Sequence, residues 1–477
     1  MKYETVIGME VHVELHTESK MFCACPAHHF QVGANEHVCP VCTAQPGALP
    51  VINGRALELT AMTGLALHCQ VRPHSVFARK NYVYPDLPKG YQISQYELPI
   101  CEDGWVDIDL EGGTKRIGIV RVHLEEDTGK LVHESNASLV DYNRAGVPLM
   151  EIVTDATLRS ADEAFAYVQR IRQIVRYLDA STGDMEKGAM RCEANISVRP
   201  EGSDEFGTKV EVKNLNSFRS VRNAIDYEVK RQIEVIGEGG AVRQVTMGWD
   251  EGEGFTREQR SKEYADDYRY FPEPDLLDVR VDDAWMQRVE EHLPEMPDAK
   301  ATRFVDAHGL GSEDAAQLAE DRAVAEYFEA VVAGEGVDPK TAANWMTGEF
   351  FRRLKETDEA DIATASVRPG QLAQLLKLIG NDTISGSAAK DVFGIMWETG
   401  DEPDAIVEAK GLKQISDSSE LESAVDDVIS EQAEAADKVR GGDEKPIQFL
   451  MGQVMRATRG KANPQLVQQL LRERLLP

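Results

Sequence analysis

A change of pattern at Leu293–Asp298 constrains the fold of this 477-residue chain more than any other feature. Before this segment, short apolar stretches alternate with polar residues, and frequent glycines separate them, as in β-strands joined by turns. After it, the chain is rich in alanine and acids and follows a helical period. One hydrophobic core rarely extends over so many residues, so we expect several domains.

Three domains are expected along the chain. Residues 1–293 form an α+β domain, because their strands do not alternate regularly with helices. Residues 294–403 form an all-α helical domain, which ends at a second break, Gly400–Asp404. Residues 404–477 form a small helical tail domain.

Two helices are predicted inside the first domain. Ser160, with Glu163 three residues later, predicts a capping box at the start of one helix. The other helix begins near Ser217. Apolar residues at helical spacing follow both starts, so each helix presents one apolar face to the core.

The segment Ile7–Leu15 has the alternating pattern of a half-buried strand, with Glu10, His12 and Glu14 on one face. Like charges in a row repel, and burying them unpaired costs free energy. A divalent cation removes this cost, because Mg²⁺ prefers carboxylate oxygens and an imidazole can join them. A solvated strand face is the alternative.

Later segments add acids of the same kind. The strand-like stretch Ile117–Asp127 ends in three consecutive acids, and Arg191–Val198 alternates again with Glu193 on its polar face. Glu151 lies between Met and Ile inside an apolar run. A buried carboxylate there needs a cation or a metal beside it. We therefore favour a magnesium site built from several strands.

Four of the seven cysteines are clustered near the N-terminus: Cys23, Cys25, Cys39 and Cys42. Cys-x-Cys followed by Cys-Pro-x-Cys indicates a closed, structural Zn²⁺ site that braces the loop 23–42. Disulfides are the weaker alternative in a chain without a secretory leader. Three histidines of the same loop are alternative ligands: His28, His29 and His37.

The formal net charge of −30 argues against general electrostatic binding of nucleic acid. The segment Lys445–Pro477 is the exception, because its basic residues outnumber its single acid. It predicts a local contact with a polyanion, with a solvated helix face as the alternative. No apolar run is long enough to cross a membrane, and no secretory leader is evident. We expect a cytoplasmic protein with no membrane association.

Three nucleotide-binding motifs are absent: the P-loop, the dinucleotide-binding glycine pattern and the kinase catalytic loop. ATP would therefore bind through acids and a metal. The loop Arg79–Gln95 also carries Lys80 and Lys89 among tyrosines and amides, which can hold phosphate and stack on a base. An ordinary tyrosine-rich surface loop is the alternative.

A second candidate for phosphate binding is the helix start after the strand Thr208–Lys213. Asn214, Asn216 and Ser217 lie there, and a helix N-terminus favours anions. A plain N-cap is the alternative, and both interpretations can hold together. Metal, clustered carboxylates, lysines and an anion-binding helix start fit phosphoryl transfer.

Six segments carry a resemblance to a known family: Ile7–Leu15, Asn81–Gln95, His123–Asp127, Lys213–Ser217, Asp267–Leu276 and the terminal Gly460–Pro464. They resemble the B subunits of the heterotrimeric tRNA-dependent amidotransferases. The resemblance covers essentially the whole chain. It implies a catalytic domain folded like glutamine synthetase and the guanido kinases. It also implies a helical domain and a small tail domain, both of which contact tRNA.

The resemblance also implies a reaction. ATP phosphorylates the side-chain carboxylate of Glu-tRNA(Gln) or Asp-tRNA(Asn), and ammonia then displaces phosphate to give the amide. The chain has lysine at position 2 and no amidase-type serine run, so a partner must supply ammonia. The family's A subunit is an amidase-type glutaminase, and its small C subunit holds the pair together. Two rival hypotheses are a free-standing small-molecule carboxylate–amine ligase and a non-catalytic tRNA-binding adaptor.

Site residues follow from the resemblance by position. Four residues match the Mg²⁺ and catalytic positions: Glu10, His12, Glu125 and Glu151. Glu193 stands where relatives often carry Asp, and its longer arm argues against direct ligation. Lys80 and Glu126 match catalytic positions near an ammonia channel, where a Lys–Glu pair would act as a polar gate. The cysteines match a zinc-bearing branch, and Asp267–Leu276 receives no role.

Overall fold

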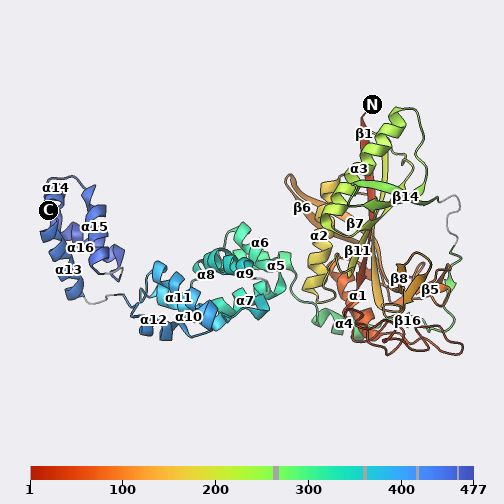
Figure 1. Ribbon diagram of the computed structural model, residues 1–477, viewed down its shortest axis with the longest axis horizontal. Coiled ribbons are helices and arrows are strands. Elements are labelled where there is room, and N and C mark those ends of the chain that lie inside the picture. The colour runs from red at the N-terminus through yellow and green to blue at the C-terminus, as the bar shows by residue number, and fades with distance from the viewer. Residues whose placement is uncertain (1, 262–267, 358–361, 415–417, 459–460, 477) are drawn as a thin grey trace. The chain divides into compact units, whose positions relative to one another are not determined.

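The computed structural model describes residues 2–261, 268–357, 362–414, 418–458 and 461–476 (Figure 1). The chain divides into two compact units, Met1–Met296 and Pro297–Pro477. This division falls inside Leu293–Asp298, where strand patterns give way to helical ones. The first unit combines a large sheet with helices, and the described part of the second unit is helical, which confirms α+β followed by all-α.

The sheet of the first unit has β1 near its centre, and all neighbouring strands are antiparallel except β12 and β13. Its strands are, in spatial order, β14 (Phe255–Ser261), β13 (Val245–Asp250), β12 (Val210–Leu215), β11 (Met190–Pro200), β1 (Tyr3–Glu14), β10 (Pro148–Thr154), β7 (Gly113–Glu126), β6 (Cys101–Leu110) and β2 (Gln70–Val71).

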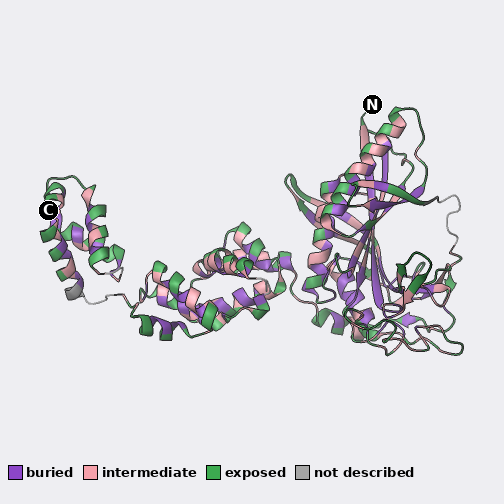
Figure 2. Cartoon of the chain, in the orientation of Figure 1, coloured by how far each residue is buried: buried purple, intermediate pink, exposed green. Residues whose placement is uncertain are grey.

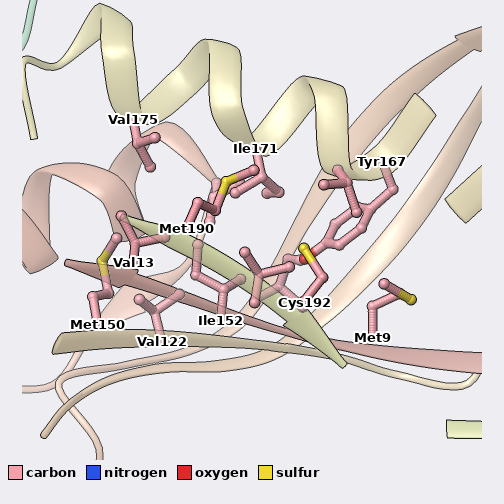
Figure 3. Packing of buried hydrophobic residues seen from close by; sticks show 14 of the residues in the cluster. Met9, Val13, Val122, Met150, Ile152, Tyr167, Ile171, Val175, Met190 and Cys192 are labelled. Atoms are coloured by element: carbon pink, nitrogen blue, oxygen red, sulfur yellow. The ribbon is translucent and has the colours of Figure 1, made fainter. Parts of the chain in front are cut away.

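One face of this sheet forms the core of the first unit. Val11 lies opposite Ile152 and Cys192 on the neighbouring strands, and all three are buried. Helix α2 (Ala161–Tyr177) packs on this face through Tyr167 and Ile171, as Figure 3 shows. Each fully buried side chain of this size contributes about 1.5–3 kcal/mol, so packing fixes which face of β1 turns inward.

Helices α1 (Gly54–Ala66) and α3 (Phe218–Gly237) also contact the sheet. The predicted start of α3 is confirmed, because Ser217 caps it by accepting from the Ser220 amide. Ser160 likewise caps α2, accepting from the Glu163 amide. The predicted capping box is wrong, however, because the Glu163 carboxylate accepts from the Arg159 amide and from Lys115 instead.

Smaller elements surround the sheet. A three-stranded sheet joins β15, β4 and β5, and β8 and β9 form a hairpin. The elements are β3 (His74–Ser75), β4 (Ala78–Asn81), β5 (Tyr91–Ser94), β8 (Lys130–His133), β9 (Ser138–Asp141), β15 (Phe271–Pro272), β16 (Val279–Arg280) and α4 (Asp283–Glu291).

The second unit has two separate hydrophobic clusters, and its helices show buried and exposed faces in Figure 2. Helices of the first cluster are α5 (Pro297–His308), α6 (Ser312–Ala319), α7 (Arg322–Val332), α8 (Pro339–Trp345), η1 (Met346–Phe350), α9 (Phe351–Glu356), η2 (Ile362–Thr364), α10 (Pro369–Gly380), α11 (Gly386–Thr399) and α12 (Pro403–Lys410). Those of the second are α13 (Ser418–Glu431), α14 (Ala433–Arg440), α15 (Pro446–Ala457) and α16 (Pro464–Leu475).

The break predicted at Gly400–Asp404 is a turn between two helices of the first cluster. Gly400 adopts a left-handed conformation after α11, and Pro403 begins α12. Ile406 and Val407 of α12 are buried in the first cluster, so its packing continues past residue 403. In the described segments, none of the helices has the length and apolarity that a membrane crossing requires.

Candidate active site

Polar side chains line the face of the central strands opposite the core. Because side chains alternate along a strand, the inward positions of Val11 and Val13 place His12 on the other face. His12 lies opposite Glu151 of β10 and Arg191 of β11, and Glu10 lies opposite Glu193. Residues from distant parts of the sequence therefore meet on this face.

The first acid cluster consists of His12, Glu125 and Glu151, whose ligand atoms all lie within 4.8 Å of one another. His12 Nε2 is 3.6 Å from Glu125 Oε1 and 3.5 Å from Glu151 Oε2. Ser94 Oγ donates to Glu125 at 3.2 Å, and His123 Nε2 lies 3.1 Å from Glu151. Carboxylate oxygens are the donors that Mg²⁺ prefers, so Glu125 and Glu151 fit the predicted ion, with His12 beside them.

The charges of this cluster support one another. Burial alone would raise the pKa of Glu151, but His123 and His12 beside it hold that pKa well below its usual range. Burial alone would lower the pKa of His12, but Glu151 and Glu125 raise it to about 9. Glu151 is therefore ionised at neutral pH, and a bound metal cation would take the place of the proton on His12.

The second acid cluster consists of Glu10, Glu193 and Glu211, again with ligand atoms within 4.8 Å. Lys213 Nζ is 2.7 Å from Glu193, and Asn195 Nδ2 donates to Glu10 at 2.9 Å. Burial, followed by the charges of Glu151 and Glu193, raises the pKa of Glu10. A carboxylate that is costly to ionise alone gains from a bound cation.

The structure thus divides the predicted magnesium ligands between two clusters. Residues two apart on one strand are separated by about 6.7 Å, so Glu10 and His12 project to different points of the face. Glu10 groups with Glu193, which we had expected not to be a direct ligand. Glu193 lies directly opposite Glu10, so its carboxylate joins the cluster although its side chain is longer than that of aspartate.

Lys80 lies on β4 beside aromatic rings. Its Nζ is 5.0 Å from the centre of the Tyr268 ring and 5.9 Å from that of Tyr82. Burial alone would lower the pKa of Lys80, but the charges of Glu125, Tyr270 and Glu151 hold it above its usual range. The Lys80 ammonium is therefore a fixed positive charge near the first acid cluster.

The polar gate expected from Lys80 and Glu126 has a different cation in this structure. Glu126 Oε2 lies 2.6 Å from Nζ of Lys89, and the Ile93 amide donates to Glu126 Oε1 at 3.0 Å. The arrangement of the strands explains why Glu126 pairs with Lys89. Glu126 is the last residue of β7, which runs beside β5, and the loop that carries Lys89 leads directly into β5.

Arg79, predicted to bind phosphate, is held by acids. Its guanidinium makes two hydrogen bonds of 2.7 Å to Glu273, whose side chain is fully buried, and it stacks on the Tyr91 ring at 4.1 Å. Bidentate arginine–carboxylate pairs are strong and directional. Arg79 therefore anchors the segment around Glu273 to β4.

The predicted phosphate site at the start of α3 lies at the end of β12. Asn214 and Asn216 are exposed, and Asn214 adopts a left-handed conformation with φ of 64°. Ser217 serves as the N-cap. Lys213 of the same strand touches the second acid cluster, so the helix start begins close to that cluster.

The four clustered cysteines form a third candidate metal site. Their sulfur atoms lie within 4.8 Å of one another, all four are free thiols, and Sγ of Cys39 and Sγ of Cys42 are 3.8 Å apart. Zinc–sulfur bonds of about 2.3 Å give tetrahedral edges of about 3.8 Å, whereas a disulfide bond measures about 2.05 Å. The cysteines therefore fit zinc, and none of the three loop histidines is in the group.

The cysteine loop, residues 23–42, is tied to the polar face. His29 Nε2 lies 2.9 Å from Glu14 Oε2, which is buried at the end of β1. Lys20, also fully buried, donates to the carbonyl groups of His37 and Tyr142 and lies 3.7 Å from the sulfur of Cys42. The loop is thus fixed against the strands that carry the acids.

Comparison with known proteins decides the family. The chain matches the family model of the GatB/GatE catalytic domain over residues 5–287 and that of the GatB domain over residues 326–475. The chain belongs to the GatB family. Relatives named as the B subunit of aspartyl/glutamyl-tRNA(Asn/Gln) amidotransferase come from Syntrophotalea carbinolica (50% identical over 475 residues, 99% of each chain) and Geotalea uraniireducens (52% over 480 residues, 100% of each). Another, from Thermoanaerobacter pseudethanolicus, is 51% identical over 476 residues and 100% of each chain.

Two site residues of this GatB-family chain were not predicted from the sequence. Glu211 completes the second acid cluster, and His123 contacts Glu151. Glu211 shares the alternating face of its strand with Lys209 and Lys213, a signal that the sequence contains. His123 lies on a strand that had been singled out only for its terminal acids.

Proposed function

We propose that this chain is the B subunit of an aspartyl/glutamyl-tRNA(Asn/Gln) amidotransferase. It activates the side-chain carboxylate of Glu or Asp on Glu-tRNA(Gln) or Asp-tRNA(Asn) with ATP and converts it to the amide. Full-length similarity to relatives of that name supports the proposal. The observation that carries the chemistry is the meeting of six ligand residues from five strands in two adjacent acid clusters.

The two clusters fit the needs of phosphoryl transfer. Their carboxylates would hold Mg²⁺, which would supply neutralisation of the phosphate oxygens of ATP and so favour attack on the γ-phosphorus. A carboxylate oxygen of the substrate attacks the γ-phosphorus, the bond to the β-phosphate oxygen breaks, and ADP leaves. Ammonia then attacks the acyl carbon, loses a proton, and expels inorganic phosphate together with that oxygen.

Lys80 is the cation that this arrangement offers to the transferred phosphoryl group. It has no acid partner within 4 Å among the described residues, whereas Arg79 is held by Glu273 and Lys89 by Glu126. The start of α3, with Asn214, is a second anion site, suited to the other phosphates of ATP. We therefore favour Lys80 over Arg79 and Lys89 as a phosphate ligand.

The remaining parts of the proposal follow from the family. An amidase-type glutaminase subunit supplies ammonia, a small third subunit holds the pair together, and the helical second unit contacts tRNA in the cytoplasm. The first unit would share its fold with glutamine synthetase and the guanido kinases. Zinc in the cysteine cluster would brace the loop beside Glu14 and leave no open position for catalysis.

The test is Glu125→Gln in the assembled amidotransferase. The substitution keeps the shape and removes the charge, so ATP-dependent activation should fall by at least about 100-fold while tRNA affinity stays unchanged. Glu134→Gln, at an exposed residue beside β8, is the matched control. Full activity of Glu125→Gln would contradict the proposal, and amidation of free glutamate without tRNA would favour the small-molecule ligase.

A further inference from the structure

The segment Tyr268–Asp275 has no role in the chemistry described so far. It runs beside β4, where Phe271 of β15 pairs with Arg79 and Pro272 pairs with Ala78. The Asn81 side chain donates to the carbonyl groups of Tyr268 and Arg269 at 3.1 and 2.9 Å. The segment is thus pinned to the strand that carries Lys80.

A second anchor lies at the other end of the segment. Glu273 is buried, and its carboxylate receives both hydrogen bonds from Arg79. Breaking such a pair is strongly destabilising, because it leaves the buried carboxylate without a compensating charge. Together, Asn81 and Arg79 hold the segment on both sides of the position of Lys80.

Between these anchors, aromatic rings surround the Lys80 side chain. The Tyr268 ring lies 5.0 Å from its Nζ and is in edge contact, at 6.0 Å between ring centres, with both Tyr82 and Tyr270. Tyr270 in turn stacks on Tyr96 at 4.4 Å. A ring face attracts an ammonium group while making no ion pair that would occupy it.

The small sheet of β15, β4 and β5 also meets the acids. Lys80 lies opposite Gln92 on β5, and the Gln92 side chain donates to the carbonyl group of Glu126 at 2.7 Å. Ser94 of the same strand donates to Glu125. The strand that carries Lys80 is therefore connected, through β5, to the end of β7.

We propose that Tyr268–Asp275 is a positioning segment, in which the Tyr268 ring holds the Lys80 ammonium near the first acid cluster for contact with the transferred phosphoryl group. The inference rests on the proposed function, because it gives Lys80 that task. A lysine chain has four rotatable bonds and loses much freedom when it is fixed. Fixing it before the substrate binds removes that cost from the reaction.

The test compares Tyr268→Leu with Tyr268→Phe in the assembled amidotransferase, with ammonium chloride as the ammonia donor. Phe keeps the ring face, so its kcat should stay within about twofold of the original. Leu removes the ring, so kcat should fall about 10- to 100-fold while KM for aminoacyl-tRNA stays unchanged. Leu277→Ala, at an exposed residue just beyond the segment, is the control.

A second measurement does not depend on activity. Trace acetylation followed by mass spectrometry reports how readily the Lys80 amine reacts, and Tyr268→Leu should raise that rate several-fold relative to Lys187, a highly exposed lysine. Combining Tyr268→Leu with Lys80→Met should cause no loss beyond that of Lys80→Met alone.

The outcomes separate this inference from the proposed function. If Lys80→Met is impaired but Tyr268→Leu changes neither kcat nor the labelling rate, the positioning role is overturned and the proposed function stands. If the two substitutions have independent, additive effects, Tyr268 does not act through Lys80. If Lys80→Met is fully active, the inference fails, whereas the proposed function is judged by Glu125→Gln.

Discussion

Buried acids on the polar face depend on residue-level pairing. Asp127, next to Glu126, lies 2.7 Å from Arg191 and 3.7 Å from Arg144. Burial alone would raise the pKa of Asp127, but Arg191 and Arg144 lower it to about 2. Because the folded state holds the proton less tightly than the unfolded chain, the pair stabilises the protein above about pH 4. That stability is lost as the pH falls from about 4 to 2.

We predict that Asp127→Asn lowers the free energy of unfolding of the first unit by about 2 kcal/mol at pH 7. The loss should shrink as the pH falls towards 2, so the acid limb of the stability curve becomes shallower. Urea unfolding between pH 2.5 and 7 measures both effects. Asp107→Asn, which breaks a more exposed pair with Arg116, should cost much less. Equal losses in both variants would contradict this account.

Residue types could be predicted from the sequence, but not how the residues are grouped. The alternation of Ile7–Leu15 correctly placed Glu10 and His12 on one face. Which acids they meet depends on register with β10 and β11, whose residues lie more than 130 positions away. Local patterns carry no information about that register. For the same reason, the sequence could not show that Glu126 pairs with Lys89, and the expected pair with Lys80 is not formed.

At the scale of elements, the cysteine loop and the helices illustrate what local sequence determines. Spacing alone was enough to bring four cysteines together, because all lie within 20 residues. The N-caps Ser160 and Ser217 are equally local. The partner of the Glu163 side chain is not local, since Lys115 reaches it from β7.

We predict that Cys39→Ser lowers the stability of the protein more than it lowers its catalytic activity. It opens a structural metal site, so the zinc content should fall from about one ion per chain towards zero, and the melting temperature should fall by several degrees. Elemental analysis and calorimetry measure the two. Cys69→Ala, at a buried cysteine outside the cluster, should keep the zinc. A Cys39→Ser protein with full zinc content would show that these thiols do not hold the ion.

At the scale of the whole molecule, the second unit carries the charge contrast seen in the sequence. Within the described residues of the tail, Arg472 pairs with Glu444 and Arg474 pairs with Glu422. Lys445 and Arg456 have no acid partner within 4 Å there. The basic surface available to a polyanion is therefore smaller than the composition implies.

We predict that removing residues 418–477, which hold their own hydrophobic cluster, weakens tRNA binding and makes it less sensitive to salt. Filter binding from 50 to 300 mM salt measures affinity and slope together. Lys445→Ala with Arg456→Ala should lower the slope by about 1–2, since each phosphate that is no longer neutralised lowers it by about one. An unchanged affinity after truncation would exclude the tail from tRNA binding.

The central claim is that the acid clusters support transfer of the γ-phosphoryl group to a carboxylate on tRNA. The most direct measurement uses Glu-tRNA(Gln) labelled with ¹⁸O in its side-chain carboxylate, with ATP, Mg²⁺ and ammonia. One labelled oxygen should appear in the inorganic phosphate for each amide formed, because the acyl phosphate loses that oxygen when ammonia attacks. Label in AMP, or amide formation with no label in phosphate, would contradict the account.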